Sequence, residues 1–205
     1  MAKQITTRLY LARHGQISLA TDVFYGCTDI DINAAGRKQA QALARVMKNI
    51  SVDRIYTSRL KRTISTAQYI SRQNGISIAP LEQLNEFGFG HWEGKTVGEI
   101  KKLYPAEFGV WVKDTNNFKS PGGESFSGFR KRVEKAINGI AGKNKGRNIL
   151  VVCHAGVIRA YLAYLFGVDF RTTWKVSVDY CSLSKIEFYG KYPVIAYLNY
   201  VTSSE

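Results

Sequence analysis

The chain has 205 residues, of which 45% are hydrophobic and 22% are charged. This is the composition of an ordinary globular protein, and a chain of this length buries a full core without disulfide staples. The net charge of +13 favours an anionic partner. The longest apolar stretch, residues 157–168, is too short to span a bilayer and contains Arg159, so we expect no membrane-spanning segment.

The cysteines favour a cytoplasmic protein. Cys27, Cys153 and Cys181 form no Cys-x-x-Cys motif, and their number is odd. They are typical of reduced, mostly buried thiols. Residues 1–7 are polar and contain no recognisable signal peptide, so we expect a cytoplasmic location.

The positive charge by itself does not identify the partner. Basic residues are spread along the chain, with one tight cluster at 130–132 and a looser one at 143–147. Charge is the whole argument for nucleic acid, and the basic face of a helix is ordinarily a solvated one. Charge therefore indicates an anion without identifying it, and we expect neither nucleic acid nor a membrane; the two arginines described below favour a small phosphate ester as the partner. The oligomeric state, monomer or homodimer, stays open.

Strand and helix signals alternate along the chain. Short apolar runs that end at a breaker indicate strands, and apolar residues at helical spacing after a capping residue indicate helices. The first half predicts a strand over 9–12, a helix after Asn33, a strand at 53–57, a helix ending at Gly75 and a strand at 76–79 closed by Pro80. The second half predicts a capped helix from Thr96, a helix from Pro105, a long helix over 126–140, a strand at 149–153, a helix over 157–166 and strands at 182–188 and 194–200.

This alternation predicts an α/β fold. Right-handed strand–helix–strand units place helices against a mostly parallel sheet. Residues 84–94 contain too many glycines for a regular element, so we expect an ordered loop there. The segment of about 86–123 is interpreted as a small cap insertion, within one domain that spans residues 1–205.

Two of the three histidines follow predicted strands and precede a glycine or an alanine–glycine pair. His14 follows the first strand, and His154 follows the strand at 149–153. Residues just past the carboxyl ends of parallel strands line the crevice where open α/β sheets bind ligands. A lone histidine is more often structural, but two at equivalent strand ends favour a shared catalytic role.

Two arginines are candidates for the same crevice. Arg13 precedes the first histidine, and Arg62 lies where the second strand turns into its helix. Guanidinium groups bind phosphoryl oxygens in bidentate fashion and oppose protonation of a nearby imidazole. A neutral histidine keeps a lone pair for attack on phosphorus, which makes His14 a candidate nucleophile.

The leaving alkoxide needs a proton, and Glu86 is the candidate donor. Repulsion from a dianionic phosphate favours the protonated carboxyl group, so Glu86 could serve as a general acid near neutral pH. The ordinary alternative is a surface carboxylate in a loop.

Other chemistries have weaker support. His14, His154 and Glu86 could form a metal site of two histidines and one carboxylate, but the guanidinium of Arg13 would repel a divalent cation. The sequence has no metalloprotease, Walker or dinucleotide motif. Ser58 and Ser125 are interpreted as turn or cap residues, because neither lies in a nucleophile elbow.

Several stretches, in this order, resemble the histidine phosphatase superfamily, the phosphoglycerate mutase-like group. The resemblance runs from about residue 8 to the last strands and rests on residues 11–16, 57–67, 84–86, 89–94, 121–125 and 151–157. It implies a three-layer α/β/α fold and a phosphohistidine at His14. It also implies that Arg13, Arg62 and His154 hold the phosphate, that Glu86 acts as acid and then base, and that no metal or other cofactor is needed.

Within the superfamily the chain is most similar to the α-ribazole phosphatases of cobalamin biosynthesis, through residues 24–29, 36–40 and 174–180. This similarity implies α-ribazole 5′-phosphate as substrate. We expect further substrate contacts from Gln16, Tyr25, Gly26 and Ala155. His91 departs from the family pattern, which usually has an acidic residue there.

Three alternatives stay open. A phosphoglycerate mutase or a sugar-bisphosphate phosphatase would use the same residues, although mutases carry a longer insertion between the acid and the second histidine. A phosphatase-like domain that only binds a partner through its basic surface is the non-enzyme alternative. The complete set of expected catalytic residues argues against it.

Overall fold

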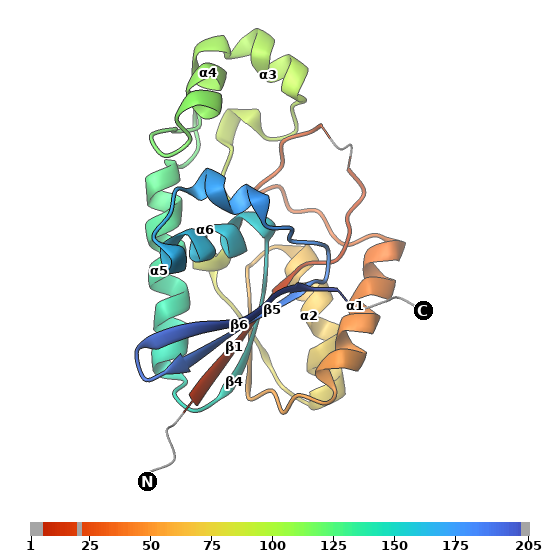
Figure 1. The fold of residues 1–205 in the computed structure, drawn as a ribbon. Helices are drawn as coiled ribbons and strands as arrows, with labels where there is room; N and C mark the ends of the chain where they lie inside the picture. Colours follow the sequence, from red (N-terminus) through yellow and green to blue (C-terminus); the bar gives the residue numbers. More distant parts are fainter. Residues whose placement is uncertain (1–5, 20–21, 202–205) are drawn as a thin grey trace.

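The computed structural model describes residues 6–19 and 22–201. Its centre is a six-stranded sheet in the order β3-β2-β4-β1-β5-β6 (Figure 1). The strands are β1 (Thr6–Arg13), β2 (Arg54–Thr57), β3 (Ile78–Pro80), β4 (Asn148–Cys153), β5 (Leu183–Tyr189) and β6 (Tyr192–Tyr200).

The sheet is mostly parallel, as predicted. β1 pairs with β4, β4 with β2 and β2 with β3 in parallel, whereas β5 and β6 add an antiparallel hairpin beside β1. In the register of β1 and β4, Arg13 lies opposite Cys153. The residues that follow these two strands therefore leave the sheet side by side.

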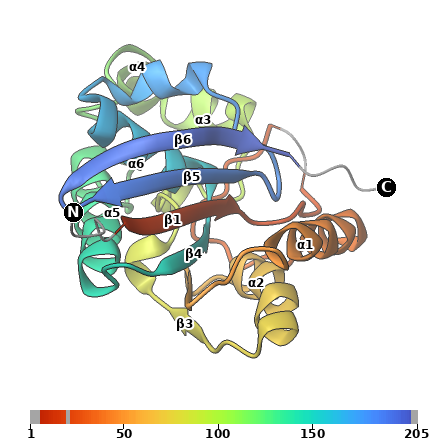
Figure 2. The ribbon, with the colours of Figure 1, turned by 60° about the horizontal axis from the view of Figure 1, so that its bottom comes forward.

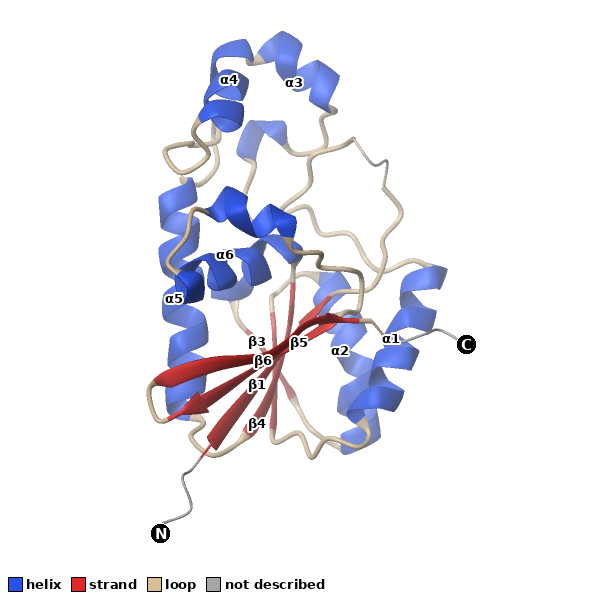
Figure 3. Ribbon diagram, viewed as in Figure 1, coloured by secondary structure: helices blue, strands red, loops and turns tan. Residues whose placement is uncertain are grey.

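Helices cover both faces of the sheet, which confirms the three-layer α/β/α prediction (Figures 2 and 3). The helices α1 (Ala34–Met47) and α2 (Lys61–Asn74) cover one face, and α5 (Phe126–Lys143) and α6 (Ala155–Phe166) cover the other. Alternation along β1 sends Tyr10 and Ala12 to the first core and Leu9 and Leu11 to the second. Each β1 side chain therefore has a helix layer to pack against.

The segment interpreted as a cap carries two short helices. The helices α3 (Val97–Leu103) and α4 (Pro105–Lys113) lie apart from the sheet, beyond one of its ends (Figure 1). Three 3₁₀ turns, η1 (Glu82–Leu84), η2 (Gly90–Trp92) and η3 (Phe170–Lys175), interrupt the neighbouring loops. The glycine-rich stretch at 84–94 is thus a loop with one short helical turn.

Local capping signals fix the helix ends as predicted. Asn33 accepts a hydrogen bond from the Gly36 N–H at 2.8 Å, and Thr96 and Glu99 form a reciprocal capping box. Ser125 accepts from Gly128, which confirms its interpretation as a cap. Gly75 ends α2 at φ 65°, a left-handed conformation that glycine adopts without strain.

Several strand ends differ from the prediction by one to three residues, and the difference at β3 changes the place of a proline. β3 begins at Ile78, and Pro80 belongs to the strand instead of closing it. β3 is an edge strand, where the missing N–H of a proline interrupts no second ladder. In the part of the chain that the structure describes, no helix has both the length and the apolarity needed to cross a bilayer.

We expect Asn33→Ala to lower the free energy of unfolding by about 1 kcal/mol, because it removes the N-cap of α1. Denaturant unfolding measures the change, with Lys38→Ala at an exposed position of the same helix as the control. Equal effects of the two substitutions would show that the N-cap hydrogen bond of Asn33 does not contribute to the free energy of unfolding.

Candidate active site

The two strand-end histidines meet. His14 follows β1 and His154 follows β4, and their ring centroids are 5.2 Å apart. The backbone N–H of His14 donates to the carbonyl of Cys153 at 3.0 Å, which extends the parallel pairing one residue past the strand. Both side chains are buried. The parallel register thus places two imidazoles together although 140 residues separate them in sequence.

His14 has a defined tautomer. Its Nδ1 lies 2.8 Å from the carbonyl oxygen of Gly15, which only accepts hydrogen bonds, so Nδ1 carries the proton. Nε2 then holds the lone pair. Burial lowers the pKa of His14 well below its ordinary value, and the charges of Arg62 and Arg13 lower it further. At neutral pH the ring is therefore uncharged and nucleophilic.

His154 has the opposite tautomer. The Nε of Arg62 donates to its Nδ1 at 3.2 Å, so a neutral ring carries its proton on Nε2, 2.9 Å from the Oγ of Ser58. Burial, followed by the charge of Arg62, lowers the pKa of His154 well below its ordinary value. Ser58 is fully buried and also accepts from the Leu60 N–H, so it holds the ring in this orientation.

The guanidinium of Arg62 is fully buried and joins three parts of the chain. In addition to His154, it donates to the carbonyl of Thr28 at 2.7 Å and to that of Gly26 at 2.5 Å. These contacts use three of its five N–H donors. Arg62 therefore binds α2 to both the histidine pair and the loop at 26–28.

Arg13 lies on the other side of His14. Its guanidinium carbon is 3.7 Å from the centre of the Tyr180 ring, and one Nη donates to the carbonyl of Val178 at 2.8 Å. Its Nε is buried and has no hydrogen-bond partner among the described residues. The stacking and the hydrogen bond thus hold the guanidinium of Arg13 in place and leave its Nε–H available to another acceptor.

Glu86 is part of the site and not a solvated surface residue. Its two carboxylate oxygens accept from the N–H of Phe87 and from the N–H of Gly156, each at 3.0 Å. Gly156 lies in the first turn of α6, two residues after His154, and a Cβ at this glycine would overlap the Glu86 carboxylate. Close approach of the acid to the histidine pair therefore requires glycine at position 156.

The loop at 26–28 is held by Glu93. Its carboxylate accepts from the N–H groups of Gly26, Cys27 and Thr28 and from the Thr28 hydroxyl. Burial alone would raise the pKa of Glu93, but these hydrogen bonds outweigh it and lower the pKa. A Cβ at Gly26 would overlap the carbonyl oxygen of Phe87, so this position also needs glycine.

The remaining predicted residues lie around this centre. The Tyr25 hydroxyl is 3.5 Å from that of Tyr180, and burial raises the pKa of Tyr25 to about 12. Ala155 is the first residue of α6, directly after His154. Gln16 is hydrogen-bonded through its backbone, with its N–H donating to Gln39 at 2.9 Å. His91 is exposed and packs against Gly122.

Sequence reasoning missed four residues of the site. Ser58, considered only as a turn residue or a nucleophile, holds His154, and Tyr180 stacks on Arg13. Glu93 and Arg132 hold loops. Arg132 belongs to the basic cluster at 130–132, but its guanidinium is directed inward, to Glu124 and the carbonyls of Asn85 and Glu86. The glycines and aromatic residues around Glu93 marked its loop, but no local signal marked Arg132.

The metal alternative finds little support in the donor set. Both ring nitrogens of His154 and both carboxylate oxygens of Glu86 already have protein partners, which leaves Nε2 of His14 as the uncommitted atom. Among the described residues, no three or more His, Cys, Asp or Glu side chains form a group that could hold a metal ion.

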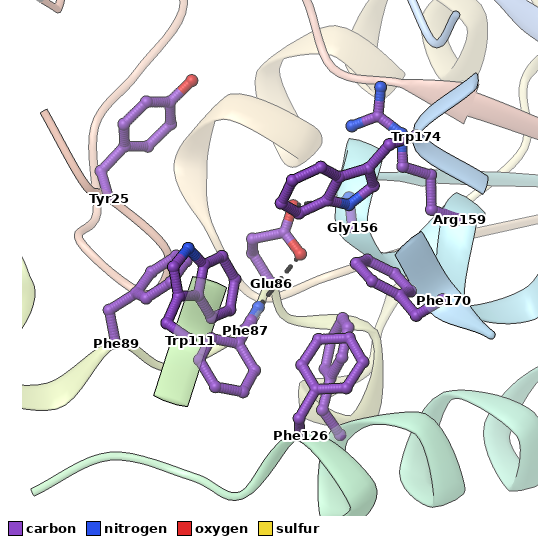
Figure 4. Close-up of a pocket in the computed structure, with 11 residues that line it drawn as sticks. Tyr25, Glu86, Phe87, Phe89, Trp111, Phe126, Gly156, Arg159, Phe170 and Trp174 are labelled. Atoms are coloured by element: carbon purple, nitrogen blue, oxygen red, sulfur yellow. Dashed lines mark hydrogen bonds between the residues drawn. The ribbon is translucent and has the colours of Figure 1, made fainter. Parts of the chain in front are cut away.

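A pocket of about 190 Å³ adjoins Glu86 and Gly156. Tyr25 and Arg159 also line it, and most of the other lining residues are aromatic (Figure 4). Glu86, which accepts from the Gly156 N–H close to His154, therefore lies between this pocket and the histidine pair.

Comparison with known proteins supports the same family. Phosphoserine phosphatase 1 of Hydrogenobacter thermophilus is 31% identical over 193 residues, which cover 94% of this chain and 92% of the relative. The adenosylcobalamin/α-ribazole phosphatase of Escherichia coli is 30% identical over 94% of this chain and 95% of its own. The crystal structure of the α-ribazole phosphatase from Shigella flexneri superposes with a TM-score of 0.86 at 28% identity, covering 96% of this chain and 98% of the other.

The sequence profile of the histidine phosphatase superfamily (branch 1) matches residues 9–201, which include both strand-end histidines, Arg13, Arg62 and Glu86. With this match and relatives of 30% identity or more over nearly the whole chain, the protein belongs to the histidine phosphatase superfamily.

Proposed function

We propose that this protein is a metal-independent phosphomonoesterase that works through a phosphohistidine on His14. The observation that carries the proposal is a buried, neutral imidazole with its Nε2 lone pair uncommitted, beside the two guanidinium groups that lower its pKa. The proposal takes residues 1–205 as one domain, in which the segment of about 86–123 forms a cap. Free thiols at all three cysteines support a cytoplasmic location.

In the first step, Nε2 of His14 attacks phosphorus and the bond to the leaving alkoxide breaks. Glu86, in its protonated form, donates its proton to that oxygen. Arg13 and the two unused N–H donors of Arg62 bind the equatorial oxygens and stabilise their charge, together with His154. The hydrogen bond from Nδ1 of His14 to Gly15 stabilises the positive charge that develops on the ring.

In the second step, Glu86 is a carboxylate and takes a proton from water. The hydroxide attacks phosphorus, the N–P bond breaks, and inorganic phosphate leaves with His14 neutral again. The net reaction consumes one water and yields one alcohol and one phosphate. The short span between Glu86 and His154 favours water over a returning phosphoglycerate as the acceptor.

As substrate we propose α-ribazole 5′-phosphate. The relative from Escherichia coli and the structure from Shigella flexneri, both described as α-ribazole phosphatases, support this assignment, as do residues 24–29 and 174–180. The Hydrogenobacter relative makes phosphoserine the competing substrate. We propose Gln16, Tyr25, Gly26 and Ala155 as additional substrate contacts.

The phosphohistidine gives the direct test. Incubation with a ³²P-labelled monoester followed by rapid quenching should trap an acid-labile, base-stable label on the wild type and on His91→Asn, but none on His14→Asn. His91 is the matched control because it is exposed and away from the histidine pair. Full hydrolytic activity of His14→Asn would overturn the proposal.

Stability at acid pH tests the neutral state of His14. Because its folded pKa is lowered, the unfolded chain binds a proton that the folded chain excludes, so stability falls as the pH drops below about 6.5. One such group contributes a slope approaching about 1.4 kcal/mol per pH unit. Denaturant unfolding between pH 7.5 and 5 should give His14→Asn a slope smaller by that amount, whereas His91→Asn should match the wild type.

Ser58 is proposed as a positioning residue for His154. We expect Ser58→Ala to lower kcat on the order of tenfold, because an imidazole that is free to rotate no longer orients Arg62. Imidazole ¹⁵N NMR should also lose the signature of the Nε2–H tautomer at His154. Ser51→Ala, at an exposed position, is the control. An unchanged ¹⁵N spectrum of Ser58→Ala would contradict the role.

A further inference from the structure

The pocket beside Glu86 is unusually aromatic. Eight of its eleven lining residues are Phe, Tyr or Trp (Figure 4). The cap contributes Trp111 from α4, and the opposite wall contributes Trp174 from η3. The two indole rings lie 6.1 Å apart, so the cap and the body of the protein meet at this pair.

Core packing explains only some of these rings. Phe87, Phe126 and Phe129 are buried and form part of the core beneath the pocket. Trp174, in contrast, is 50% exposed, although it lies against Phe170 and Trp111. Together with the seven other aromatic lining residues, this half-exposed indole forms an apolar patch at a concave site, and such patches mark ligand-binding grooves.

The pocket has few polar groups for a ligand. Glu86 and Arg159 are the two charged lining residues. The Nη2 of Arg159 is 3.4 Å from the carbonyl of Val176, and its Nε is buried with no hydrogen-bond partner among the described residues. Arg159 is thus the one cationic donor among the lining residues, in walls that are mostly aromatic.

We infer that this pocket binds a planar aromatic ring system carried by the leaving alcohol, with Trp174 and Trp111 as the residues that determine this specificity. The inference rests on the proposed function and narrows its substrate class. Glu86 determines on which side of the phosphate the leaving group lies, because it protonates the oxygen that joins the phosphate to the rest of the alcohol. Whatever is attached to that oxygen enters the pocket that Glu86 lines.

The same walls disfavour the phosphoserine class. The serine leaving group carries an ammonium and a carboxylate, which lose hydration on entering the pocket. Arg159 is the one cation among the lining residues, and Glu86, which is protonated in the first step, leaves the substrate ammonium without an anionic partner there. An aromatic ring instead gains burial and stacking against the indoles, and its ring nitrogen or hydroxyl can accept from Arg159.

Three esters test the inference. Naphthylethyl phosphate and ethyl phosphate release similar primary alkoxides, so their kcat/KM ratio reports on the ring alone, and phosphoserine supplies the charged comparison. We expect naphthylethyl phosphate to be preferred at least tenfold over the other two. Trp174→Ala should lower the naphthylethyl-to-ethyl ratio about tenfold, the effect of one lost stacking contact with its buried area.

Phe166→Ala is the matched control, because Phe166 is 51% exposed but lies outside the pocket. It should leave the ratio unchanged. Equal kcat/KM values for the two alkyl esters, a preference for phosphoserine, or an unchanged ratio in Trp174→Ala would overturn the inference.

A binding measurement separates this inference from the proposed function. Naphthyl fluorescence reports binding of naphthylethyl phosphate to the His14→Asn protein, with and without Trp174→Ala. Binding that depends on Trp174, without hydrolysis of any ester by the wild type, would sustain the pocket and refute the phosphatase. Hydrolysis of all three esters, with binding that does not depend on Trp174, would support the phosphatase and refute the assignment of the pocket.

Discussion

The buried guanidinium of Arg62 is the interaction on which the site depends. A buried cation needs hydrogen-bond acceptors, and here three of the five guanidinium N–H groups donate to the ring of His154 and to the two backbone carbonyls at 26 and 28. Those partners come from two separate parts of the chain, and Arg62 joins both of them to α2. These contacts orient the second histidine and hold the loop at 26–28, and the charge of Arg62 adds to burial in lowering the pKa of His14.

Two further charged residues hold the irregular backbone that surrounds this centre. The loops at 26–28 and 84–88 lack the ladder of a sheet, so side chains must satisfy their N–H and carbonyl groups. Glu93 accepts from the N–H groups of the first loop, and Arg132 donates to the carbonyls of the second. The position of Glu86 thus depends on Arg132, an inward-directed arginine of α5, as well as on its own hydrogen bond to Gly156.

In the proposed mechanism, chemistry and selectivity are divided between the two sides of Glu86. The ends of β1 and β4, set side by side by their parallel register, provide the two histidines and Arg13, and the first turn of α2 provides Arg62. The cap and η3 provide the aromatic walls on the leaving-group side. A change in the walls can therefore alter which alcohol is accepted without moving the nucleophile, which explains how one fold in this superfamily includes relatives that act on such different esters.

The sequence by itself determined the elements, the helix caps and the identity of the two histidines, two arginines and Glu86, because strand ends and caps are local signals. It did not determine how these side chains are held. Ser58 and His154 are 96 positions apart, and Glu86 and Arg132 are 46 apart. Such pairings depend on which loops the sheet brings together, so Arg132 resembled a solvated surface charge until the fold turned it inward. The tautomers of His14 and His154, the aromatic pocket and the exposed indole of Trp174 were likewise decided by tertiary packing, because each is a relation between segments that only the closed sheet places side by side.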